Sequence, residues 1–190
     1  MNLFQIIFID IIFIMFPLLV YLFYITYTYN VDKKENNLFL DLALLTSFYL
    51  VISFGYDFSY KLPFIIYNIP LVIAYIKKRH LSIFMLSSCL ILYFASYYEL
   101  NPIFFTIEYL LYYIIFLLKS KKIKKELTFL LYILVVKIIF YIILVITLEP
   151  NHNVNIYTVI EIISYLLLFV GVIYCSIVLF KKGEEISNLH

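Results

Sequence analysis

The sequence predicts an all-α fold, a polytopic transmembrane helix bundle of about seven spans. Three observations predict it: 65% of the 190 residues are hydrophobic, only 14% are charged, and the mean hydropathy is +1.03. Soluble globular domains are nearer to about 45–50% apolar and about 25% charged residues. Most of this chain is therefore expected to have the lipid bilayer as its solvent.

Seven apolar segments follow one another along the chain. They cover residues 3–29, 38–56, 62–76, 81–98, 103–118, 127–148 and 156–180. A helix needs roughly 20 apolar residues to cross a bilayer, within a range of about 17–25. The third and fifth segments are shorter than this range. Either they recruit flanking aromatic residues, or a re-entrant pair leaves about five true spans.

The first segment contains Pro17, and the third contains Pro70 near its middle. A proline inside a helix removes one backbone hydrogen bond and can kink the helix. In a bilayer, the carbonyl groups freed in this way must be satisfied by neighbouring helices or by water. We therefore expect both spans to be kinked and to receive such hydrogen bonds.

Two other pairs of residues have structural interpretations. Asp41 and Asp57 lie near the two ends of the second segment, where we expect solvated charges. Cys89 and Cys175 lie inside apolar runs, where we expect small buried side chains. Their placement indicates neither a disulfide framework nor a metal site.

The basic residues fall on alternate loops. Four stretches hold all 14 Lys and Arg residues except Lys61 and Lys137. These stretches are 30–37, 77–80, 119–126 and 181–190. Cytoplasmic loops carry an excess of Lys and Arg, so this alternation predicts an outer N-terminus and a cytoplasmic C-terminus. The run at 119–126 is expected to contact anionic lipid, and we expect no nucleic-acid partner.

Five polar residues within the apolar segments are the candidate site for ligand sensing or coupling. They are Asp10, Asn68, Glu108, Lys137 and Glu161. Ionisable groups inside a bilayer are functional candidates because their burial is costly. At a rise of 1.5 Å per residue, all except Lys137 lie roughly 8–10 Å below the outer boundary. Two hypotheses stay open: a polar cavity in the outer half, or hydrogen bonds that only hold helices together.

Lys137 needs a partner, because a lone ammonium in the bilayer centre costs roughly 2.5–3.5 kcal/mol. Glu108 and Glu161 are the obvious acidic partners. Helical side chains tilt toward the N-terminus of their own helix, and this tilt points Lys137 away from both glutamates. The alternatives are water, Tyr141, Ser87 and Ser88.

The sequence contains no recognisable catalytic machinery. We find no serine-protease or zinc-protease motif, and three glycines are too few for a phosphate-binding loop. His80 and Cys89 lie nine residues apart, about 13 Å along one helix, which is too far for a thiolate–imidazole pair. We therefore expect no catalytic residue, metal or cofactor in this chain.

The tail LFKKGEEISNLH resembles the signalling helix that leads from a membrane sensor into the dimerisation helices of bacterial histidine kinases. The stretches FIMFPLLVYLFY and KLPFIIYNIPLVIAYIKKR resemble the membrane sensor halves of multi-span, sporulation-type sensor kinases. Those kinases are related to the five-span sensors of autolysis-regulating kinases. The resemblance covers the whole chain through its span pattern and proline placement.

The resemblance implies a sensor bundle over residues 1–180 and the start of a cytoplasmic signalling helix over 181–190. It implies a multi-pass protein of a bacterial plasma membrane that detects an extracellular or intramembrane cue. Its partners would be membrane lipids, a second copy joined through the C-terminal helix, and a response regulator reached through a kinase region. That region is absent here, so whether the protein is an enzyme stays open.

Two other functions are considered. The length and span count also fit a small transporter subunit, such as the substrate-binding component of a vitamin uptake system. The scarcity of Gly and Ala for close helix packing argues against it. In the third hypothesis, the chain is a structural membrane protein whose polar residues only join helices.

Overall fold

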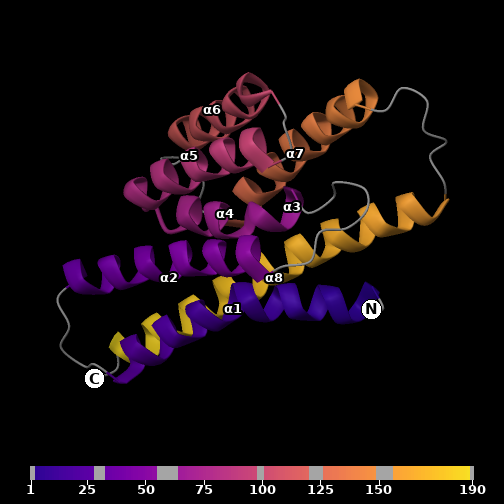
Figure 1. Cartoon of the computed structure of the whole chain (residues 1–190). Helices are drawn as coiled ribbons and strands as arrows, with labels where there is room; N and C mark the ends of the chain where they lie inside the picture. The colour runs from indigo at the N-terminus through magenta and orange to yellow at the C-terminus, as the bar shows by residue number, and fades with distance from the viewer. Residues whose placement is uncertain are drawn as a thin grey trace. The chain divides into compact units, whose positions relative to one another are not determined.

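The computed structural model describes residues 3–27, 33–54, 64–97, 101–119, 126–148 and 156–188 (Figure 1). Its elements are α1 (Leu3–Tyr27), α2 (Lys33–Phe54), α3 (Phe64–Tyr67), α4 (Ile69–Ile76), α5 (His80–Tyr97), α6 (Pro102–Lys119), α7 (Glu126–Leu148) and α8 (Ile156–Asn188). Each predicted apolar segment contains helix, and the described residues contain no strand. The all-α prediction is therefore confirmed.

Three of the described helices are long and apolar enough to cross a membrane. The stretches are Phe8–Tyr27 in α1, Glu35–Phe54 in α2 and Leu166–Gly183 in α8. Shorter apolar helices cover His80–Ser96, Pro102–Leu118 and Thr128–Ile143. Their length and composition support a helical membrane protein, while the count of seven spans and their direction stay predictions.

The helices form two compact units. Unit 1 comprises Met1–Leu86 and Tyr165–His190, and unit 2 comprises Ser87–Ser164. The division falls within α5 and within α8, so each of these helices has residues in both units. The chain is therefore described below one unit at a time.

In unit 1, α1 packs antiparallel against α2. The ring of Phe13 lies 6.0 Å from that of Phe54, and Tyr24 stacks on Phe39 at 4.1 Å. Residue numbers rise along α1 as they fall along α2, which fixes the antiparallel direction.

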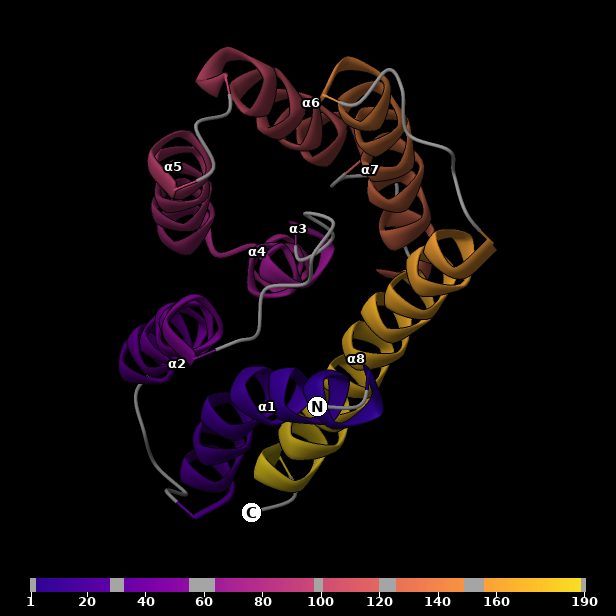
Figure 2. The same cartoon turned by 45° about the vertical axis from the view of Figure 1, so that its right-hand side comes forward.

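The C-terminal half of α8 runs parallel to α1 (Figures 1 and 2). Ser176 Oγ donates to Met15 Sδ at 3.5 Å, and the ring of Tyr21 lies 5.9 Å from that of Phe180. Residue numbers rise together along the two helices. Any membrane that both helices cross is therefore crossed in the same direction.

The proline in α1 is accommodated as the sequence predicts. The helix continues through the buried Pro17 and changes direction along its length (Figure 2). In the turn before Pro17, the carbonyl of Ile14 accepts a hydrogen bond of 2.7 Å from the buried Ser47 hydroxyl of α2. A side chain of a neighbouring helix thus donates to a carbonyl close to Pro17.

The third apolar segment forms a broken helix that is buried from Ile66 to Tyr75. A turn at Asn68 separates α3 from α4, and all the described side chains from Ile66 to Tyr75 are buried. Pro70 stands in the first turn of α4, where its missing N–H costs little. At 1.5 Å per residue, α3 and α4 together span roughly 20 Å, less than the ~30 Å hydrocarbon core. Burial in protein permits such a break in the backbone.

A tight turn joins α4 to α5. The N–H of Arg79 donates to Ala74 O at 2.9 Å, and the N–H of Lys78 donates to Tyr75 O at 3.1 Å. With Lys78 at a φ of 55°, this is a Schellman motif. The carbonyl of Arg79 accepts from the N–H of Ile83 at 2.9 Å, so Arg79 is also the N-cap residue of α5.

Lys78→Gly is expected to raise the free energy of unfolding by about 1 kcal/mol, since a residue with a Cβ is strained at positive φ. Detergent-induced unfolding followed by circular dichroism would measure this change. Lys78→Ala is the matched control, because it removes the same charge but keeps the Cβ. An equal gain in the alanine variant would contradict the backbone explanation.

In unit 2, α6 and α7 form an antiparallel hairpin. The ring of Phe104 lies 5.0 Å from that of Phe140, and Phe116 lies 6.2 Å from Phe129. Both pairs are symmetrical in residue number about residues 120–125 to within one residue. Residues about equally far from this segment therefore face each other across the hairpin.

The prediction for the two cysteines is wrong, because Cys89 and Cys175 are both exposed. A helix in a bilayer presents apolar side chains to lipid as well as to other helices. A small apolar residue therefore gains little from burial in protein. Many large apolar side chains are exposed for the same reason, including Phe8 and Phe84.

Candidate functional site

A buried ionic cluster lies inside the α6–α7 hairpin of unit 2. The Nζ of Lys137 donates to Oε1 of Glu108 at 2.9 Å, and the two side chains are 5% and 1% exposed. The hydroxyl of Tyr112, one turn along α6, donates to the same oxygen at 2.6 Å. We call these three residues the hairpin cluster.

Hairpin register explains why Lys137 meets Glu108. The two residues are symmetrical in number about the loop 120–125, like the phenylalanine pairs beside them. Of the partners that the sequence leaves open for Lys137, the structure therefore shows Glu108. Side-chain tilt argues against this pair at the depths expected from the segment boundaries, but the hairpin places both residues at one level.

The hairpin cluster satisfies two donors with one carboxylate oxygen. Such a pair is stable only while both charges stay together, because each alone is costly to bury. The structure shows the paired arrangement, in which each charge offsets the burial cost of the other.

The other predicted site residues belong to other elements of the chain. Asp10 on α1 and Asn68 at the break before α4 are 3% and 1% exposed, and both belong to unit 1. Glu161 lies on α8, but its side chain is outside the described residues. Of the five residues, the structure brings together Glu108 and Lys137. A common level for Asp10, Asn68, Glu108 and Glu161 stays a prediction.

A second ionic cluster lies in unit 1. Nε of Arg79 donates to Oδ1 of Asp41 at 3.0 Å, and Nη2 donates to Oδ2. The buried hydroxyl of Ser82 donates to Oδ1. Asp41 is 6% exposed, so the prediction of a solvated charge is wrong. The predicted counterpart, Asp57, lies outside the described residues.

Backbone geometry builds this second cluster. The Schellman turn places Arg79 between α4 and α5, opposite Asp41 on α2. Hydrogen bonding to Asp41 raises the pKa of Arg79 above its usual value, although partial burial lowers it. The guanidinium therefore stays charged throughout the physiological range.

Sequence reasoning missed this cluster, although one signal was present. Arg79 is the only arginine among 14 basic residues. The planar guanidinium can bind a carboxylate through two parallel hydrogen bonds, whereas the lysine ammonium is a point charge. A lone arginine in a lysine-rich sequence therefore indicates a specific acidic partner.

The same turn also contacts α8. Nζ of Lys77 lies 4.7 Å above the ring centroid of Phe180, within the range of a cation–π interaction. One short turn thus contacts α2 through Arg79 and α8 through Lys77. We call Asp41, Lys77, Arg79, Ser82 and Phe180 the turn junction.

No metal centre accompanies the two clusters within the described parts of the chain. There, no group of three or more His, Cys, Asp or Glu side chains is placed to hold a metal ion. Comparisons with protein-family models, curated proteins and solved structures find no match for this chain.

Proposed function

We propose that this chain is a membrane-embedded sensor and signal-transducing module of the sensor histidine kinase type, with α8 as its output helix. One observation supports the proposal most. α8 is a single 33-residue helix, about 50 Å long at 1.5 Å per residue. The hydrocarbon core is ~30 Å thick, so α8 can cross it and still extend about 20 Å beyond.

The predicted direction of α8 agrees with the contacts in unit 1. The turn at Lys77–Arg79 contacts α8 at Phe180, beside Lys181 and Lys182. Two of the basic stretches predicted to be cytoplasmic therefore lie at one end of unit 1. This supports a cytoplasmic C-terminus in a bacterial plasma membrane.

The turn junction gives α8 a route to the other helices of unit 1. Rotation or sliding of α8 must change the packing of Phe180 against Lys77 and Tyr21. Because α8 also has residues in unit 2, it can carry a change from one unit to the other. The hairpin cluster is the proposed coupling element in unit 2. Asp10, Asn68 and Glu161 remain candidates for sensing the cue.

A fusion to a cytoplasmic histidine kinase region tests the output role. The full chain would be joined to that region after Glu185, and autophosphorylation would be measured in membranes. Each inserted residue rotates the downstream helix by about 100°. Insertions of one to six residues should therefore make the kinase output rise and fall with helical phase.

A seven-residue insertion is the matched control, because it restores the phase after about two turns. It should return the output close to that of the uninterrupted fusion. An output that is the same at every insertion length would contradict the role of α8. So would an output that only declines with length, as expected of a passive tether.

A further inference from the structure

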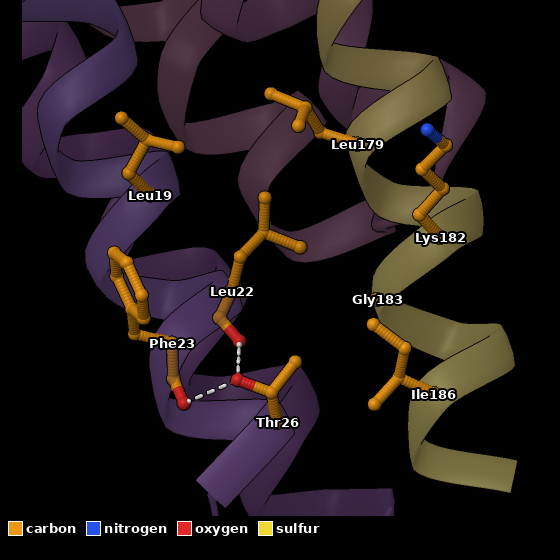
Figure 3. Close-up of a pocket in the computed structure, with 8 residues that line it drawn as sticks. All are labelled: Leu19, Leu22, Phe23, Thr26, Leu179, Lys182, Gly183 and Ile186. Carbon is orange, nitrogen blue, oxygen red and sulfur yellow. Dashed lines mark hydrogen bonds between the residues drawn. The ribbon is translucent and has the colours of Figure 1, made fainter. Parts of the chain in front are cut away.

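A groove of about 200 Å³ lies between the C-terminal halves of α1 and α8 in unit 1 (Figure 3). α1 contributes Leu19, Leu22, Phe23 and Thr26, and α8 contributes a stripe of the same spacing from Leu179 to Ile186. This spacing places each stripe on one face of its helix. Two parallel helices thus present matching faces to one groove.

The floor of the groove is apolar. A Cβ on Gly183 would lie 3.0 Å from the Cδ2 atom of Leu22, so the glycine brings α8 close to that side chain. The Thr26 hydroxyl donates within α1 to the carbonyls of Leu22 at 3.1 Å and Phe23 at 2.9 Å. Its polarity is therefore largely satisfied inside the helix (Figure 3).

One charged residue, Lys182, lines this groove and is exposed. Within the described residues, Lys182 takes part in no ion pair. The neighbouring Lys181 is also exposed, and Lys77 lies nearby over the ring of Phe180. One cation, Lys182, thus borders an apolar groove near the end of a candidate membrane span.

We propose that this groove binds a phospholipid with an anionic headgroup. Its acyl chain would lie along Leu19, Leu22 and Leu179, and its phosphate would pair with the Lys182 ammonium. Apolar protein cavities of ~150 Å³ bind small apolar molecules, and basic residues near a membrane surface attract anionic lipid. The lipid would join α1 to α8 where α8 leaves the bilayer. This proposal needs both helices in a membrane, but it does not need the sensor function.

A second groove on α1 provides an internal control. It has a volume of about 220 Å³, lies between α1 and α2, and includes Phe16. Its lining is apolar apart from Tyr21 and Thr46 and contains no charged residue. It can accept an acyl chain, but it offers no cation for an anionic headgroup.

Tryptophan fluorescence can compare the two grooves, because the chain contains no natural tryptophan. Phe23→Trp would report on the α1–α8 groove and Phe16→Trp on the α1–α2 groove. The phenylalanines are 63% and 60% exposed, so both substitutions are equally mild. Each variant of the full chain would be placed in vesicles with brominated phosphatidylglycerol or brominated phosphatidylcholine at equal mole fraction.

The Phe23→Trp reporter should show about a fivefold higher apparent affinity for brominated phosphatidylglycerol, the effect of roughly one basic residue. The Phe16→Trp reporter should show no preference. Adding Lys182→Gln to Phe23→Trp should abolish the preference but keep quenching by phosphatidylcholine.

Four results would overturn the proposal. They are equal quenching of Phe23→Trp by both lipids, a preference that survives Lys182→Gln, an equal preference at Phe16→Trp, and a lack of quenching by either lipid. In the last case, cross-linking between copies through Phe23→Cys would show that a second chain covers the groove.

Discussion

Lys137→Met is expected to lower the free energy of unfolding by about 3 kcal/mol, one of the two largest effects predicted here. The substitution keeps a long unbranched side chain but removes the ammonium. Glu108 is then left buried with Tyr112 as its remaining partner in the hairpin cluster. Detergent-induced unfolding in mixed micelles, followed by circular dichroism, would measure the change.

A double substitution tests whether the loss of stability comes from the unpaired charge of Glu108. Replacing both Glu108 and Lys137 with methionine should recover most of the lost stability, since apolar replacements of buried pairs are often neutral or stabilising. Lys182→Met is the matched control, because that lysine is exposed. It should change stability by less than about 0.5 kcal/mol. A single Lys137→Met variant as stable as this control would contradict the buried pair.

Asp41→Asn is expected to cost about 3 kcal/mol, because it leaves the guanidinium of Arg79 partly buried without its counter-ion. Arg79→Lys should cost less, about 1–2 kcal/mol, since a lysine keeps the charge but loses one of two parallel hydrogen bonds. The same unfolding experiment would measure both variants. Glu35→Gln, at an exposed position of α2, is the control and should stay within about 0.5 kcal/mol.

The raised pKa of Arg79 determines how the contribution of the Asp41–Arg79 pair to the free energy of unfolding changes with pH. Because the pKa of Arg79 is raised in the folded protein, its contribution is fully present below its unfolded pKa. The contribution is lost only when pH rises through the folded pKa, in strongly alkaline solution. The stability difference between the parent and Arg79→Lys should therefore not change across neutral pH. A marked change there would contradict the assignment.

The helices could be predicted because their signal is local. Apolar runs bounded by charged residues predicted the helices in order, and α1 continues through Pro17 with a hydrogen bond from Ser47 of α2 close by. The break at Asn68 was harder to predict. The break depends on other parts of the chain that pack around it and bury its backbone. The sequence close to Asn68 does not indicate which parts these are.

Of the two ionic clusters, one could have been predicted from the sequence and the other could not. Glu108 and Lys137 were both identified, and counting equally from the loop 120–125 would have paired them. Asp41 could not be paired in that way, because its partner Arg79 stands in a turn far along the chain. The position of Arg79 depends on the positive φ of Lys78. A glycine would have indicated a left-handed conformation in the sequence, whereas a lysine does not.

The kinase output of the fusion carrying methionine at both Glu108 and Lys137 tests whether the hairpin cluster couples to the output helix α8. This variant is expected to fold, so any change in output reports on the charges rather than on unfolding. We expect autophosphorylation to shift by about fivefold or more from that of the parent fusion, a typical allosteric coupling. An unchanged output in an equally stable variant would show that the hairpin cluster only holds helices together.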